Sequence, residues 1–225
     1  MSLDMKKSIL TVFAISITVV MAWACSQGKA AQEKKAAREQ KAAQEAAINN
    51  IMSRKSVRSF TDQKLTGEQI ETLLKAAMAA PSAINIQPWS FVVIDDDALK
   101  QELWGGARKS EMFTGAPVVV VVCGEYKTMR KPFGQPDAEP EEWENIFWSQ
   151  DCSAATENLL LAAEAMGLGA VWTALYPTER MEPVIAKLGL PDNVKPLCAV
   201  PIGDPAGDDQ PKDKWKPEKI HYNRW

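Results

Sequence analysis

The chain has 225 residues, of which 46% are hydrophobic and 24% are charged, and its formal net charge is −3. This length accommodates one globular domain with a sizeable core and a smaller segment at one end. The slightly acidic balance, without any Lys/Arg-rich run, excludes a surface built to bind nucleic acid.

Residues that commonly carry metal or acid–base chemistry are scarce. The single histidine, His221, excludes a site with several histidine ligands. The four cysteines form no CxxC pair, which excludes a zinc ribbon and a thioredoxin-type motif. We therefore expect no metal site and, for an enzyme, a cofactor that brings its own reactivity.

Residues 1–25 have the pattern of an export signal. Lys6 and Lys7 precede an apolar run, residues 9–24, which is shorter than the ~20 residues of a comfortable membrane span. The segment Ala22-Trp23-Ala24-Cys25 resembles a bacterial lipoprotein cleavage site, so we expect a lipid anchor on Cys25. An uncleaved anchor helix and ordinary secretion with cleavage after Ala24 are the alternatives. All three predict a domain outside the cytoplasm, and the lipid anchor predicts a place at the cell envelope.

Residues 26–47 are rich in Ala, Lys, Glu and Gln and contain no large apolar side chain. This composition predicts a solvated tether. We expect the folded domain to occupy residues 48–225. Cys123 and Cys198 lie in apolar strand patterns and Cys152 lies in a helical pattern, and all three are expected to be core thiols.

Helix and strand patterns follow one another irregularly along this domain. A capping box at residues 66–69 opens a helix that ends at Pro81, and further helices are expected at 141–166 and 181–188. Strands are expected at 89–94, 117–123, 170–175 and 197–202. The irregular order indicates an α+β fold with a helix-flanked mixed sheet.

Two segments of the domain suggest a second copy of the chain. The helix predicted at 141–166 is apolar nearly all round, and a partner subunit would cover it. The polar C-terminal tail ends in aromatic residues, His221-Tyr222-Asn223-Arg224-Trp225, and we expect it to cross to the partner of a homodimer.

Cationic and hydroxyl side chains gather at residues 54–58, namely Arg54, Lys55, Ser56 and Arg58. Arginine, lysine and serine suit a phosphate monoester, which carries nearly two negative charges. Lys212 and Lys214 of the tail are placed to close on the same group. Taken alone, the cluster is also compatible with a solvated basic helix end.

Four motifs, in the right order between Arg54 and Trp225, resemble the FMN-dependent nitroreductase family. They are the basic segment 54–58, the loop 81–89, residues 167–174, and the late basic segment 211–214. The resemblance implies an intertwined homodimer in which the loop reaches the flavin of the other subunit. It assigns FMN binding to Arg54, Lys55, Ser56, Arg58, Pro81, Ser82, Ala83, Ile84, Asn85, Gln87, Trp172, Thr173, Ala174, Lys212 and Lys214.

The family also implies an activity. Two electrons pass from NADH or NADPH through flavin N5 to a nitroaromatic, a quinone or a similar small aromatic acceptor, with ping-pong kinetics. No side chain is expected to be catalytic, and Arg58 would tune the flavin electrostatically. An exported enzyme would need a donor other than the cytoplasmic nucleotides. A non-catalytic flavin carrier at the cell envelope, or a reductive dehalogenase or flavin-fragmenting variant, are the alternatives.

Substrate choice would lie in residues 126–142, a long segment without a helix or strand pattern that we interpret as a lid. Flat acceptors stack on flat rings. The candidate walls of a substrate pocket, most of them expected in the core, are Trp104, Phe113, Phe133, Trp143, Phe147, Trp148 and Trp172.

Overall fold

The computed structural model describes residue 29 and residues 32–225, and its contacts divide the chain into two units, residues 1–49 and 50–225. The predicted export signal and Cys25 lie outside the described residues. In the first unit, residues 32–49 are helical and exposed, with ion pairs one turn apart at Lys35–Glu39 and Lys41–Glu45. Within the described residues, no helix is long and apolar enough to cross a membrane.

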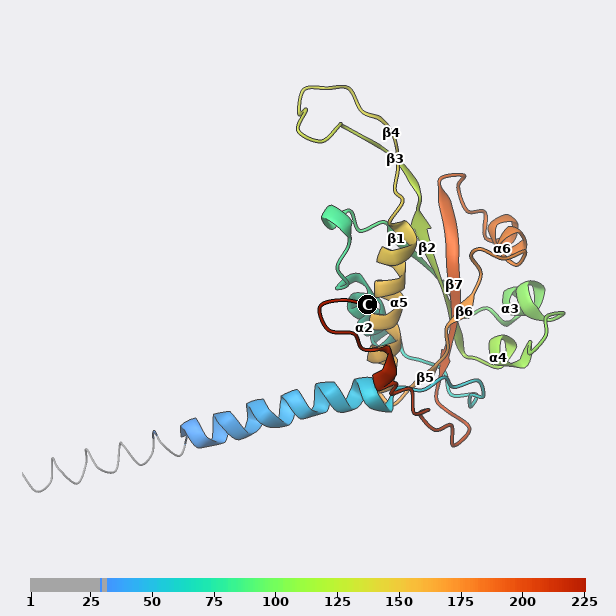
Figure 1. Ribbon diagram of the computed structural model, residues 1–225. Helices are drawn as coiled ribbons and strands as arrows, with labels where there is room; N and C mark the ends of the chain where they lie inside the picture. The colour runs from blue at the N-terminus through green and yellow to red at the C-terminus, as the bar shows by residue number, and fades with distance from the viewer. Residues whose placement is uncertain (1–28, 30–31) are drawn as a thin grey trace, which may run out of the picture. The chain divides into compact units, whose positions relative to one another are not determined.

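The second unit is built on an antiparallel sheet (Figure 1). Its long strands are β1 (Trp89–Ile94), β2 (Val118–Glu125) and β7 (Val194–Gly203), and β5 (Gly169–Ala170) and β6 (Thr173–Ala174) both pair with β7. The predicted α+β, helix-flanked fold is confirmed. All described pairs of this sheet are antiparallel, whereas a mixed sheet was expected.

Helices cover both faces of the sheet (Figure 1). One face carries α2 (Gly67–Met78) and α5 (Trp148–Ala165), and the other carries α3 (Asp97–Trp104), α4 (Glu111–Thr114) and α6 (Met181–Leu188). Along β2, Val118, Val120 and Val122 pack toward the first pair of helices, and Val119 and Val121 pack toward the others. Because both faces of this strand are buried, its sequence is an unbroken apolar run.

Local signals in the sequence set the bounds of α2 and α6. The predicted capping box is present, since Gln69 N donates to Thr66 Oγ1 at 3.1 Å and Thr66 N donates to Gln69 Oε1 at 2.8 Å. The helix expected at 181–188 is confirmed as α6, and Gly189 ends it in the left-handed conformation, with φ 63°.

The helix predicted at 141–166 is wrong in its first turns. Residues Glu141–Glu144 form strand β4, which pairs with β3 (Lys127–Arg130), and α5 begins only at Trp148. Segment 126–142, interpreted as a lid, therefore contains β3 and the first residues of β4, while residues 131–140 between them form neither helix nor strand, as expected. Pairing between strands, including the ion pair of Lys127 with Glu142 at 2.9 Å, overrides the local helix pattern.

The strand predicted at 170–175 consists of two short pieces, β5 and β6. Both follow one register against β7, with Ala170 opposite Ile202 and Thr173 opposite Ala199. The same register sets Pro201 opposite Val171. Val171 N donates to Pro201 O at 3.4 Å, but proline has no N–H with which to return a bond, so the ladder is weakened at this point.

Candidate functional site

A cationic pocket lies where residues 54–58 meet the first part of the C-terminal tail. Its volume is about 260 Å³, and it presents five cationic side chains, one carboxylate, one hydroxyl and one amide. The residues that line it are Arg54, Lys55, Ser56, Arg58, Asp209, Gln210, Lys212 and Lys214. The structure thus brings together all six of the predicted residues from the two basic segments; Asp209 and Gln210 were not predicted.

Backbone contacts anchor residues 54–58 to β5 and the following residues to the start of the tail. Val57 is 1% exposed, and its N–H donates to Ala170 O at 3.1 Å. Any side chain at Gly169 would meet Val57, because an added Cβ would lie 2.6 Å from the valine Cβ. Thr61 N donates to Asp204 O at 2.8 Å, which joins the start of the domain to the start of the tail.

Helix α5 supplies counter-charges to two of the cations. Arg54 Nε lies 3.4 Å from Glu157 Oε1, and Lys55 Nζ lies 3.3 Å from Glu164 Oε1. The pair to Glu157 uses the Nε edge of Arg54 and leaves its terminal nitrogens for another anion. Among the described residues, neither Lys212 nor Lys214 has an ion-pair or hydrogen-bond partner. The cationic pocket can therefore hold a doubly charged anion.

The loop Ser82–Gln87 is held in a sparsely populated backbone conformation. Ile84, Asn85 and Gln87 have positive φ values of 46°, 58° and 54°. For a β-branched residue such as isoleucine this is a costly conformation, and it persists only where the surroundings impose it. Gln87 N donates to Ser82 Oγ at 2.9 Å and closes the loop. Strain of this kind concentrates at functional sites.

A buried carboxylate, Asp151 of α5, fixes the start of this loop. Its Oδ1 accepts the backbone N–H of Ala83 at 3.0 Å, while its Oδ2 is buried without a partner among the described residues. Asp151 is 6% exposed. It was not predicted, because no local pattern distinguishes its carboxylate from those of Glu157 and Glu164 in the same helix.

The remaining predicted residues lie outside the cationic pocket. Ile84 lines a separate pocket beside the β3–β4 hairpin, and Thr173 lines a third one between α3 and α6. Trp172 packs with the core on the α5 side, and Ala174 is exposed. Within one chain, the loop 81–87 and residues 172–174 are thus not joined to the cationic pocket.

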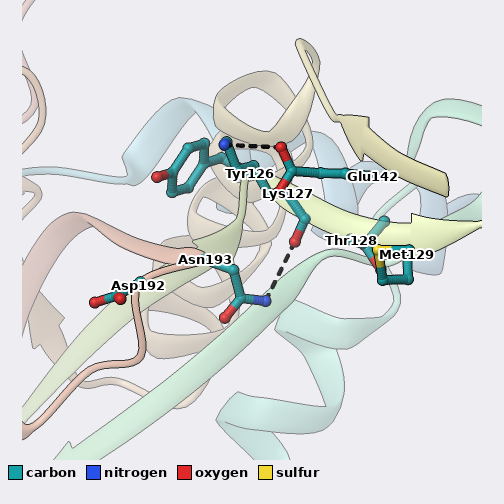
Figure 2. Close-up of a pocket in the computed structure, with 7 residues that line it drawn as sticks. All are labelled: Tyr126, Lys127, Thr128, Met129, Glu142, Asp192 and Asn193. Atoms are coloured by element: carbon teal, nitrogen blue, oxygen red, sulfur yellow. Dashed lines mark hydrogen bonds and ion pairs between the residues drawn. The ribbon is translucent and has the colours of Figure 1, made fainter.

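The base of the β3–β4 hairpin is tied to the start of β7. Asn193 Nδ2 donates to Lys127 O at 3.2 Å, and Lys127 Nζ pairs with Glu142, as Figure 2 shows. Lys195 Nζ lies 3.8 Å from the ring centroid of Tyr126. A pocket of about 350 Å³ lies at this base. These contacts give the hairpin a fixed direction relative to the sheet.

The three described cysteines are buried core thiols, as predicted. Burial raises the pKa of both Cys123 and Cys198 to about 12 and raises that of Cys152 further. None of them is a reactive thiolate at neutral pH. In the described part of the chain, no group of three or more His, Cys, Asp or Glu residues could hold a metal ion.

Comparison with known proteins identifies a common fold and sequence pattern. The profile of the Nitroreductase family matches residues 51–109 and 105–204. An Archaeoglobus fulgidus protein, named provisionally as an NADH dehydrogenase/NAD(P)H nitroreductase, is 36% identical over 80% of this chain and 99% of its own length. The FMN reductase (NADPH) of Bacillus subtilis is 30% identical over 78% of this chain and 72% of its own length.

Solved structures agree with these sequence matches. A crystal structure from Bacteroides thetaiotaomicron, of a protein named provisionally as an NADH dehydrogenase/NAD(P)H nitroreductase, superposes with a TM-score of 0.70. The two chains are 42% identical, and the match covers 80% of this chain and 98% of that one.

Proposed function

This chain belongs to the nitroreductase family, and we propose that it is an FMN-dependent oxidoreductase that passes two electrons from NADH or NADPH to a small acceptor. Two observations support the cofactor: the cationic pocket, and the similarity to an FMN reductase that uses NADPH. The reading of residues 54–58 as a solvated basic helix end is less favoured, because these side chains line one pocket with Lys212 and Lys214.

The donor set of the cationic pocket fits the phosphate of FMN. A phosphate monoester needs positive charge and N–H or O–H donors on several sides. Lys212 and Lys214 supply positive charges that form no ion pair with a described carboxylate, Ser56 supplies a hydroxyl, and Arg54 supplies its terminal nitrogens. Bound FMN would provide the two-electron chemistry, while the chain's own residues bind and orient it.

Arg58 is assigned to electrostatic tuning. Its side chain is exposed, and Nη1 donates to Ser56 O at 3.2 Å, which holds the guanidinium at the rim of the cationic pocket. A positive charge near the pyrimidine edge would favour the negatively charged reduced cofactor and raise its reduction potential. No side chain of the chain is assigned a bond-forming role.

We further propose that donor and acceptor use one site in turn. Reduction of a nitro group to a nitroso group consumes two electrons and two protons and releases water, and reduction of a quinone consumes the same number of each. Initial rates measured at several fixed acceptor concentrations would give parallel double-reciprocal lines. Intersecting lines would contradict the ping-pong scheme.

The second copy of the chain is proposed to complete the site. Apolar side chains that a stable monomer would bury are exposed: Ile51 at 52%, Met52 at 72%, Trp215 at 72%, Tyr222 at 83% and Trp225 at 101%. A homodimer would cover these side chains and would bring the loop 81–87 to the partner's cofactor. Sedimentation of the flavin-loaded protein as a monomer would overturn this arrangement.

Location at the cell envelope, with lipid on Cys25, is proposed from the sequence pattern of residues 1–25 alone. The test is the mass of the N-terminal peptide from the membrane fraction of expressing cells. A lipid-modified Cys25 at the new N-terminus is expected, and a Cys25→Ser variant would lose the modification. An unprocessed N-terminus in a soluble fraction would contradict the proposal.

The experiment for the central function is reconstitution with FMN followed by steady-state turnover with NADH and NADPH. Stoichiometric flavin and acceptor-dependent oxidation of either nucleotide are expected. Bound flavin that only dithionite reduces would instead favour a carrier or another physiological donor.

A further inference from the structure

Where the strands of the β3–β4 hairpin meet its connecting loop, there is a pocket of about 350 Å³ separate from the cationic pocket. We call it the hairpin pocket. It is lined by one residue of the strained loop, Ile84, and by the hairpin residues Arg130, Lys131, Pro132, Phe133, Glu141 and Trp143. Since Ile84 belongs to the loop that the family resemblance assigns to the flavin, the hairpin pocket adjoins the place where an acceptor would enter.

Arg130 and Trp143 form the floor of the hairpin pocket. The guanidinium carbon of Arg130 lies 4.7 Å from the ring centroid of Trp143, and both residues are half-buried. Strand register sets Arg130 opposite Glu141, but no ion pair joins the two residues. Within the described chain, the side chain of Arg130 makes no hydrogen bond either. A guanidinium held over a ring by cation–π attraction keeps its in-plane N–H donors for another partner.

The other lining residues add charge and a flat surface. Lys131 Nζ donates to Pro136 O at 2.7 Å, which holds a second cation at the rim. Glu141 is the single carboxylate of the lining, so the hairpin pocket has an excess of positive charge. Phe133 is 88% exposed and offers an aromatic face. A ligand that matches these features has a flat ring and an anionic substituent.

We propose that the hairpin pocket selects acceptors that combine a flat aromatic ring with a carboxylate or sulfonate, and that Arg130 determines this specificity. The inference rests on the proposed function, because it names the acceptor class of that site. Trp143 acts as a positioning residue: it holds the guanidinium of Arg130 where the anionic group of the acceptor arrives.

The test compares two acceptors of similar shape, the anion 4-nitrobenzoate and the neutral 4-nitrobenzamide, with the full-length, FMN-loaded protein. Arg130→Gln lowers kcat/KM for 4-nitrobenzoate about tenfold, the size of one charge-assisted hydrogen bond, and changes kcat/KM for the amide less than about twofold. The Arg130→Lys variant keeps part of the preference for 4-nitrobenzoate over 4-nitrobenzamide. Trp143→Leu lowers the ratio of kcat/KM for 4-nitrobenzoate to kcat/KM for 4-nitrobenzamide, because the guanidinium of Arg130 loses the ring that holds it.

The matched control is Arg108→Gln, which removes an exposed guanidinium from the face that carries α3 and α6. This variant leaves the ratio of the two kcat/KM values unchanged. An equal loss with both acceptors in Arg130→Gln would overturn the proposal, and so would an unchanged ratio. Slower flavin reduction by NADPH with an unchanged acceptor ratio would also overturn it, because Arg130 would then bind the phosphate of the donor.

A binding measurement separates this inference from the proposed function. Calorimetric titration of the unreduced protein with 4-nitrobenzoate needs no turnover. Weaker binding in Arg130→Gln than in the wild type supports the pocket even if no nucleotide reduces the protein, in which case only the proposed function fails. Equal binding of 4-nitrobenzoate by both proteins would reject the pocket even if the enzyme turns over.

Discussion

The carboxylate of Asp151 accepts the backbone N–H of Ala83 at 3.0 Å, across 68 positions of the chain. This bond joins the first turns of α5 to the loop in which three residues have positive φ. The hydrogen bond to Asp151 therefore helps to compensate the cost of the left-handed conformation of Ile84, and Asp151 is itself held in a helix that packs against the sheet.

Replacement of Asp151 tests whether this hydrogen bond stabilises the loop. Asp151→Ala leaves the Ala83 N–H without its acceptor, and we expect a loss of about 1–3 kcal/mol in the free energy of unfolding together with weaker FMN binding. Asp151→Asn keeps an acceptor oxygen and should cost less. Urea denaturation and flavin titration measure the two effects. Asp192→Ala, at an exposed carboxylate, is the control; an equal loss there would contradict the assignment.

The tail lysines test the phosphate assignment. In the double variant Lys212→Gln/Lys214→Gln we expect the Kd for FMN to rise roughly tenfold or more at low salt, since each lysine contributes a charge-assisted contact. The matched control is Lys216→Gln/Lys219→Gln, which removes two exposed charges of the same tail outside the cationic pocket. If the Kd for FMN rose equally in both double variants, only the net charge of the tail would affect FMN binding, which would contradict the phosphate assignment.

Relief of backbone strain should be measurable at Ile84. The residue is 64% exposed with φ 46°, so Ile84→Gly removes little buried surface and permits the positive φ. We expect the free energy of unfolding to stay constant or to rise by up to about 1 kcal/mol. The comparison is Ile94→Gly in β1, where a 2% exposed side chain is lost and a cost above roughly 3 kcal/mol is expected. A comparable loss at Ile84 would show that the loop is not strained.

The buried thiols give a pH dependence. Cys198 keeps its proton in the fold because burial raises its pKa to about 12, whereas in the unfolded chain it ionises near pH 8.5–9. The unfolded state then binds fewer protons, so the stability from this thiol is complete below about pH 9 and is lost as the pH rises toward 12. In a Cys25→Ser background, Cys198→Ala should reduce the slope of unfolding free energy between these limits by up to about 1.4 kcal/mol per pH unit. An unchanged slope would contradict the raised pKa.

Much of the fold could be predicted because its signals are local. Five consecutive valines require burial on both faces, and the Thr66–Gln69 capping box needs only residues three apart. Strand β4 could not be predicted in this way, since Glu141–Glu144 becomes extended only by pairing with Lys127–Arg130. Pro201 is a local signal for the gap between β5 and β6, because it lacks the N–H that would complete its pairing with Val171.

The same distinction holds for the candidate site. The cations of residues 54–58 and 212–214 were predicted as one phosphate site, and the structure places them in one pocket. The carboxylates Asp151, Glu157 and Glu164 were not, because their partners are distant in sequence and no local pattern marks them. Hydrogen bonds and ion pairs between remote segments are visible only after the chain has folded.

Electron transfer through bound FMN is tested by the anaerobic absorbance spectrum of the FMN-loaded protein, recorded first with one equivalent of NADH or NADPH and then with a nitroaromatic or quinone. The account predicts that the flavin colour bleaches with at least one nucleotide and returns with the acceptor. A protein that takes up no FMN, or whose bound flavin stays oxidised with both nucleotides, would contradict it.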